Sequence, residues 1–334
     1  QANIANPINF LVENVDMGRN IIIAAKNNNI KHMKNIKHLL FTAFLFAQYV
    51  VAQEDVDTLQ SNIQTYTPSK LLEKGKLDIK WFNNLYTQTK RNSIGKTLTE
   101  PRSNYFTTSL EVFTGVSENK KFNAGLILEY RSNTFADQSA TSVFAFKNEF
   151  GKARTGLSHI APSIKIAPFN ALPRFSIQSS IFIPVLDKET KNNNYLANKS
   201  FIWQNRFFYD YTFKGNKFQL FSEFGTRLFF GEKNKNADGT FNDKGGYANN
   251  SIELAPGIFL SYFPSSKFTV LSFVQHAQLV DLGNNFAQNY TAVGAGSKYQ
   301  LTKVLNLEVL YSKFVRGTDS GLGQSFNLGL RAIF

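Results

Sequence analysis

The sequence predicts an all-β protein, a closed antiparallel barrel of about twelve strands, on three observations. Apolar and polar residues alternate with period two through most of the chain, and short and long connections follow one another along it. Aromatic rings are also abundant, with 33 Phe, 13 Tyr and 2 Trp in 334 residues, although the mean hydropathy is −0.24. Strands that have one apolar and one polar face reconcile many rings with a polar average.

The alternation is clearest where a segment keeps its two faces over ten or more residues. Within residues 122–131, Phe122, Leu126 and Tyr130 share one face, whereas Glu129 lies on the other. Side chains two residues apart point the same way only in a strand, so the pattern excludes a helix. The predicted strands are 77–89, 103–115, 120–132, 154–167, 173–185, 199–213, 217–230, 249–263, 267–278, 286–299, 303–316 and 323–334.

The connections predict where such a barrel resides. Short turns alternate with longer polar loops at about 90–102, 133–153, 186–198, 231–248 and 279–285. Bacterial outer-membrane barrels have tight periplasmic turns and longer external loops, with the apolar face toward lipid and the polar face toward the lumen. A soluble β-sandwich is the alternative, but it has no reason to keep its long loops on one side. We therefore expect a transmembrane barrel over residues 77–334, with both ends periplasmic.

The residues before the barrel predict export. Lys34 and Lys37 precede a short apolar stretch and small residues, which is the pattern of a secretory signal peptide over 33–52, cleaved between Ala52 and Gln53. A buried core helix is the alternative for this segment. We interpret 1–32 as an upstream artefact or non-native extension, and 53–76 as a periplasmic extension or a lumenal plug. Export predicts the outer membrane of a Gram-negative bacterium.

Composition excludes several other classes. Helical membrane proteins need runs of about 20 apolar residues, and disulfide or structural zinc scaffolds need more than 0 Cys and 4 His. The net charge of +13 comes from Lys and Arg scattered singly, so we expect no nucleic-acid partner. Residues 236–243 resemble a calcium loop but lack its final acidic ligand, which favours an ordinary turn. We expect no cofactor and no metal.

The last strand carries an expected assembly signal at Phe326, Leu328, Leu330 and Phe334. It resembles the C-terminal signal that the barrel assembly machinery recognises in outer-membrane barrels. Residues 109–133 and 158–169, in turn, are similar to the transporter-like barrels of the phenol-degradation meta-pathway channel family. That resemblance implies a barrel over 77–334 and an outer-membrane location, and no solute. The Asn- and Lys-rich composition resembles that of Bacteroidota.

The polar face of the strands supplies the candidate lumen residues. Acidic and basic side chains are nearly balanced there, which predicts a network of paired charges and no strong ion selectivity. The candidates are Asp78, Lys80, Glu111, Glu129, Arg131, Lys165, Arg174, Arg206, Asp210, Glu223, Arg227, Glu253, Lys298, Glu308 and Arg331.

Twelve strands leave an interior wider than that of eight-stranded barrels and narrower than that of sixteen-stranded porins. The sequence therefore predicts a transporter-like channel for a small solute. The alternative is a non-conducting barrel with a structural, adhesive or envelope-complex role. Catalysis is disfavoured, since the Ser–His candidates Ser158–His159 and Ser272–His276 lie in no lipase motif. The expected partners are outer-membrane lipid, lipopolysaccharide, the assembly machinery and the solute.

Overall fold

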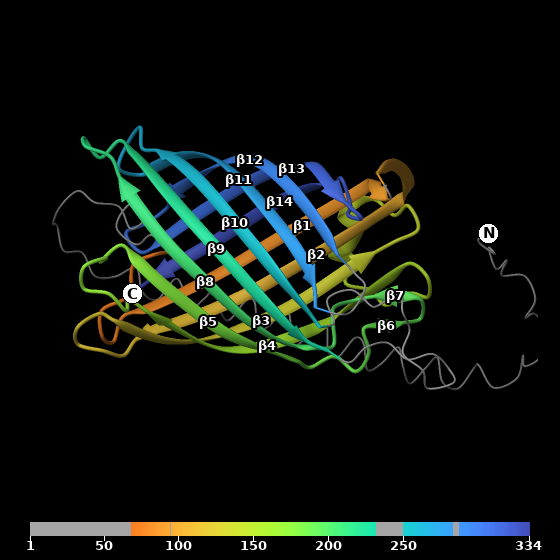
Figure 1. Cartoon of the computed structure of the whole chain (residues 1–334), viewed down its shortest axis with the longest axis horizontal. Coiled ribbons are helices and arrows are strands. Elements are labelled where there is room, and N and C mark those ends of the chain that lie inside the picture. The colour runs from red at the N-terminus through yellow and green to blue at the C-terminus, as the bar shows by residue number, and fades with distance from the viewer. Residues whose placement is uncertain (1–67, 94, 232–249, 283–286) are drawn as a thin grey trace, which may run out of the picture. The chain divides into compact units, whose positions relative to one another are not determined.

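Twelve antiparallel strands close into one barrel in the computed structural model, which describes residues 68–93, 95–231, 250–282 and 287–334 (Figure 1). The predictions for residues 1–67, including the signal peptide and its cleavage at Ala52–Gln53, lie outside the described residues, as does the loop at 236–243. Within the described part of the chain, no helix is long and apolar enough to cross a membrane.

The predicted fold class is confirmed, because each barrel strand pairs with the next and β1 closes the ring against β14. The barrel strands are β1 (Leu77–Ser93), β2 (Lys96–Gly115), β3 (Phe122–Thr134), β4 (Ala153–Ile166), β5 (Phe175–Pro184), β8 (Phe201–Thr212), β9 (Phe218–Phe230), β10 (Ser251–Tyr262), β11 (Phe268–Asp281), β12 (Gln288–Gln300), β13 (Leu305–Thr318) and β14 (Gln324–Ile333). The small elements are η1 (Ala140–Ala145), β6 (Thr190–Lys191) and β7 (Asn194–Tyr195).

The outer face of the barrel is apolar. Each of the twelve strands exposes at least one large apolar side chain, and Trp203, Ile258 and Val274 are 46%, 56% and 51% exposed. Exposed apolar area that extends around a whole barrel is what a lipid-facing surface requires, whereas soluble proteins keep such patches small. Phe326 and Leu328 of the predicted assembly signal lie on this outer face, 45% and 43% exposed.

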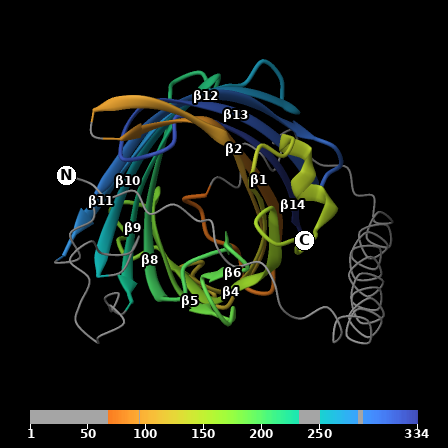
Figure 2. The ribbon, with the colours of Figure 1, turned by 90° about the vertical axis from the view of Figure 1, so that its right-hand side faces the viewer.

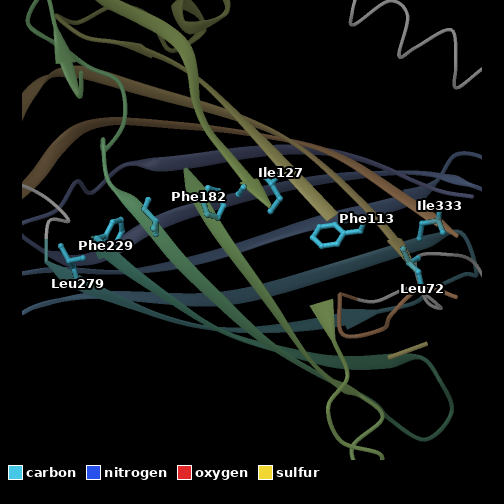
Figure 3. Close-up of a cluster of buried hydrophobic side chains, with 9 residues drawn as sticks. Leu72, Phe113, Ile127, Phe182, Phe229, Leu279 and Ile333 are labelled. Atoms are coloured by element: carbon cyan, nitrogen blue, oxygen red, sulfur yellow. The ribbon is translucent and has the colours of Figure 1, made fainter. Parts of the chain in front are cut away.

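The inner face is more apolar than the alternation suggested. Buried apolar side chains lie along the inside of the wall between the two ends of the barrel (Figure 3). The labelled members of this cluster are Leu72, Phe113, Ile127, Phe182, Phe229, Leu279 and Ile333. The prediction that the polar face lines the lumen is therefore incomplete, because inward positions carry rings and branched chains as well as charges.

The two ends of the barrel differ in their connections. One end, here called the short-turn end, has connections at 116–121, 167–174, 213–217, 263–267 and 301–304, together with the start of β1 and the end of β14. The other, the long-loop end, has connections at 135–152, 185–200, 231–250, 282–287 and 319–323. β6 and β7 lie at the long-loop end, on the right in Figure 1.

One predicted long loop is wrong. Residues 90–102 continue the barrel strands, because β1 runs to Ser93, β2 begins at Lys96, and a bulge after Gln88 absorbs the irregular register. The turn between them contains Gly95 with φ +73°, a left-handed conformation that glycine adopts without strain. The two strands satisfy each other's backbone groups, so this hairpin extends beyond the point where the apolar alternation ends.

Candidate functional site

The barrel encloses a cavity of about 610 Å³, and side chains from all twelve strands contribute to its lining. Figure 2 looks along the barrel and shows the ring of strands that surrounds this space. Cavities of roughly 300–1,000 Å³ hold small organic molecules in other proteins. The lumen is therefore the candidate functional site.

Ion pairs cross the lining from strand to strand. Arg331 donates two hydrogen bonds to Asp78, at 2.9 Å from Nε to Oδ1 and 2.6 Å from Nη2 to Oδ2. Arg206 forms the same fork with Glu223, at 2.7 and 3.1 Å. Bidentate pairs of this kind are strong and fix orientation, which keeps partly buried charges compensated. A third pair joins Lys298 Nζ to Glu308 Oε2 at 2.6 Å.

The structure places ten of the fifteen predicted lumen residues in the cavity lining. These ten are Asp78, Lys80, Glu111, Lys165, Arg206, Glu223, Arg227, Lys298, Glu308 and Arg331. The other five, which do not line the cavity, are Glu129, Arg131, Arg174, Asp210 and Glu253.

Arg174 does not face the lumen. It lies in the turn before β5, and its guanidinium is 5.8 Å from the ring of Tyr211, which is 46% exposed on the outer face. Asp210 is only 2% exposed and accepts a hydrogen bond from Ser69 Oγ. Glu253 forms a long ion pair with Arg227, with 3.8 Å between Oε1 and Nη1. Alternation predicts the face of a residue but not what covers it.

The remaining two, Glu129 and Arg131, belong to a separate cluster. Arg131 Nε lies 2.8 Å from Glu129 Oε1, and His159 Nδ1 lies 3.3 Å from the same oxygen. A bulge opposite Glu129 turns Ser158 toward it, so that Ser158 Oγ donates to Oε1 at 2.7 Å. The serine and the histidine thus share a carboxylate, whereas a nucleophilic serine needs a bond to its base.

The charges that line the cavity are not balanced. Seven basic side chains face four acidic ones, because the residues withdrawn from the lining include three of the predicted acids. The basic ones are Lys70, Lys80, Lys165, Arg206, Arg227, Lys298 and Arg331, and the acidic ones are Asp78, Glu111, Glu223 and Glu308. The expected balance of signs is therefore wrong, because basic side chains outnumber acidic ones by three in the lining, and by two when Glu253, the partner of Arg227, is counted with them.

Three of these lysines, Lys70, Lys80 and Lys165, have no carboxylate partner within 4 Å in the described part of the chain, and Lys70 is exposed. Lys80 is half-buried and lies 4.9 Å from the centre of the Phe82 ring. Lys165 donates to the carbonyl oxygens of Pro68 and Lys70, the latter at 3.1 Å, and lies 5.3 Å from the Phe208 ring. Carbonyl oxygens and ring faces stabilise a cation without neutralising it.

A row of phenylalanines crosses the inner wall over β8–β11, and the sequence analysis missed it. The ring centres of Phe208 and Phe221 are 6.0 Å apart, those of Phe221 and Phe259 are 5.5 Å apart, and those of Phe259 and Phe273 are 5.2 Å apart. Two of these contacts join residues directly opposite each other on neighbouring strands, Phe221 with Phe259 and Phe259 with Phe273. We call these four residues the phenylalanine row.

The alternation of residues between the two faces of each strand could have identified this row. Phe208 lies between Arg206 and Asp210 on the inward face, and the other three likewise share parity with inward polar residues. The neighbouring strand supplies space for the ring of Phe273, since a Cβ at Gly294 would overlap it. Composition alone cannot separate inward from outward rings, because both faces of this barrel carry them.

A chain segment lies inside the barrel at the short-turn end. Pro68, Lys70 and Leu72 line the cavity, and Leu72 is only 2% exposed. Gly75 N donates to Gly115 O at 3.0 Å, which attaches the segment to the end of β2. Of the two roles left open for 53–76, the described residues 68–72 have the position of a lumenal plug.

The long-loop end is covered by the connection 185–200. Arg154 at the start of β4 donates to the carbonyl oxygens of Lys188, Glu189 and Asn194, the last at 3.3 Å. Asn133 Nδ2 donates to the carbonyl of Leu196 at 3.0 Å, and both residues are buried. The connection 135–152 packs elsewhere, on the outer face, where Phe144 meets the ring of Phe106 at 5.2 Å.

Solved structures share this architecture. An outer-membrane channel of Pseudomonas putida F1 superposes with a TM-score of 0.59 at 10% sequence identity, over 84% of this chain and 100% of that one. The β-domain of the Bordetella autotransporter BrkA superposes with a TM-score of 0.50 at 12% identity, over 77% of this chain and 99% of that one. The chain has the fold of a bacterial outer-membrane β-barrel.

Sequence comparisons give little information beyond what the fold shows. No protein-family model matches the chain. A stretch of 35 residues is 57% identical to GDP-L-colitose synthase of Yersinia pseudotuberculosis, which is 10% of this chain and 11% of the length of that protein. A match of this length carries no activity to the barrel.

Proposed function

We propose that this chain is an outer-membrane channel for a small solute. The observation that carries the proposal is the cavity of about 610 Å³ inside a barrel whose outer face is apolar on every strand. In lipid, such a barrel leaves its interior as the only polar route across the bilayer. The solved outer-membrane channel with the same fold is consistent with this role.

The location and partners follow from the same proposal. The barrel resides in the outer membrane of a Gram-negative bacterium, with the short-turn end in the periplasm. Its apolar outer face contacts lipid and lipopolysaccharide, and β14 with Phe326 and Leu328 presents the signal to the barrel assembly machinery. Residues 33–52 direct export as a cleaved signal peptide.

We further propose that the barrel is not an enzyme. Ser158 donates to Glu129, and His159 contacts the same carboxylate, so neither serine nor histidine is arranged as a nucleophile and its base. His276 Nδ1 lies 3.0 Å from Thr291 Oγ1 on the next strand, the contact of a wall residue. Lipid hydrolysis by the purified barrel that is abolished by His159→Ala would contradict this.

A non-conducting barrel is the second candidate. It is favoured by one observation, that chain segments cover the bore at both ends, through residues 68–72 and 185–200. Such a barrel would act as a structural, adhesive or envelope-complex subunit and would purify with stoichiometric partners.

Conductance of the purified, refolded chain in planar bilayers separates the two candidates. The obstructing variant is Gln275→Trp, because Gln275 lines the cavity and is exposed within it. Its matched control is Val274→Trp, one residue away and 51% exposed on the outer face. We expect the first to reduce single-channel conductance by about half or more, because pore radius limits conduction, and the second to leave it unchanged.

Heat-modifiable electrophoretic mobility verifies that each variant is folded. A folded wild-type barrel that shows no conductance would overturn the channel proposal in favour of the non-conducting barrel. Equal conductance in Gln275→Trp and the wild type would show that ions do not pass through this cavity.

A further inference from the structure

We propose that the lumen selects organic anions that carry an apolar ring. This inference rests on the proposed channel function and names the class of its solute. Three features of the lining support it: an excess of positive charge, the phenylalanine row, and cations that lie beside rings.

The excess of basic side chains in the lining favours a negatively charged solute. Of the seven basic side chains in the lining, Lys70, Lys80 and Lys165 have no carboxylate partner within 4 Å in the described part of the chain. Lys165 is occupied by the carbonyl oxygens of Pro68 and Lys70. Lys70 itself is exposed on the segment at the short-turn end, whereas Lys80 is half-buried in the barrel wall and is therefore the cation that we choose as the anion site. An anion near Lys80 is stabilised by the surplus charge, whereas a cation is repelled by it.

The phenylalanine row favours a solute that contains a ring. Phe221 and Phe259 in the middle of the row are half-buried and line the cavity, so part of each ring is accessible from the lumen. The end members Phe208 and Phe273 also line the cavity, are only 1% and 5% exposed, and pack against the two central rings. A ring in the solute can stack on the two central rings in offset or edge-to-face geometry, which a chain-like or inorganic anion cannot do.

The two features occur in one cavity and on different walls. The row lies on β8–β11, whereas Lys80 is on β1, which in the closed strand order lies across the barrel from β9 and β10. Basic groups also flank the rings, since Arg206 lies 4.9 Å from the centre of the Phe208 ring. A neutral apolar solute would have to desolvate Lys80 without compensating it, and that is costly. An anion that carries a ring can place its charge near Lys80 and its ring against the phenylalanine row.

Three probes separate charge from ring. Benzenesulfonate has both, methanesulfonate has the same head without a ring, and benzyltrimethylammonium has a ring with the opposite charge. All three remain ionised throughout the useful pH range and do not cross lipid. In planar bilayers with the wild-type chain, we expect chloride to be more permeant than potassium. Benzenesulfonate should reduce the current saturably, at concentrations about tenfold below those required by either control probe.

Substitutions locate the effect within the lumen. Lys80→Met keeps the length of the side chain and removes its charge, and it should weaken block by benzenesulfonate by roughly fivefold. Phe259→Leu removes the ring and should weaken block by about threefold to tenfold. The controls are Lys214→Met in the exposed β8–β9 turn and Phe224→Leu on the outer face, which is 41% exposed. Neither control should change the block.

Equilibrium dialysis of labelled benzenesulfonate against the refolded protein in detergent tests the site without conduction. We expect binding by the wild type that both Lys80→Met and Phe259→Leu weaken. Binding that is equal in the wild type and in these variants would overturn the inference, whatever the conductance. A conducting barrel that prefers potassium, or that methanesulfonate blocks equally well, would also overturn it and leave the channel proposal intact.

Discussion

The two ends of the barrel are closed by different means. At the short-turn end, residues 68–76 are held by main-chain bonds to Gly115, by carbonyl contacts with Lys165 and by the buried Leu72. At the long-loop end, Arg154, which is 6% exposed, contacts three carbonyls of the connection 185–200. Side-chain bonds of Asn133 and Asn194 hold the same connection. The difference is that main-chain bonds and an apolar side chain hold the short-turn end, whereas a few buried polar side chains, with Arg154 making the most bonds, hold much of the long-loop end. One substitution should therefore loosen the second closure more than the first.

The largest effect is expected from Arg154→Ala. The substitution removes three hydrogen bonds of a guanidinium that is 6% exposed, and the carbonyl of Asn194, which lies in the buried part of the site, loses its donor. Amide exchange at Leu196, whose N–H donates to Glu189 O at 2.9 Å, should accelerate by about 100-fold. Single-channel conductance should rise at the same time.

Arg154→Lys is the matched control for that variant. It retains the charge but cannot fork onto several carbonyls, so we expect an intermediate exchange rate. An unchanged rate at Leu196 in Arg154→Ala would show that the long-loop end is held as diffusely as the short-turn end.

A smaller effect is expected from Leu72→Ala at the short-turn end. Leu72 is 2% exposed among buried apolar residues, so its truncation leaves a cavity. We expect exchange at Gly75 N to accelerate by about 30-fold, corresponding to roughly 2 kcal/mol, because the main-chain bonds to Gly115 persist. The exposed Leu172→Ala in the β4–β5 turn serves as a control. Acceleration beyond that of Arg154→Ala would reverse the comparison of the two ends.

The smallest effect is expected from Glu73→Gln. Lys120 donates to Glu73, and this hydrogen bond and its charge hold the pKa of the Glu73 carboxyl below the usual value. A lowered pKa means that the pair stabilises the closed segment above the pKa of the unfolded chain and loses this contribution as the pH falls through the folded pKa. Between the folded and unfolded pKa of the Glu73 carboxyl, amide exchange at Gly75 N should therefore depend on pH more strongly in the wild type than in Glu73→Gln. An equal pH dependence would show that the exposed pair does not support the segment.

Much of the barrel was predictable from local pattern. Period two is a property of neighbouring residues, so it identified the strands and the inward face of ten lining residues, among them Asp78 and Arg331. It failed at Arg174, which lies in a turn where alternation no longer specifies a face. It also gave too short a β1–β2 hairpin, because strands that pair with each other need no apolar face to continue.

The sequence by itself determined the architecture: twelve strands, an apolar outer face and an inner face that carries both signs of charge. Only the tertiary structure decided which inward residues meet. Strand register places Phe221, Phe259 and Phe273 in one row, and Ser69, in the segment before β1, donates a hydrogen bond to Asp210. These contacts join residues distant in sequence, and their geometry depends on register and closure around the whole ring, which no local pattern encodes.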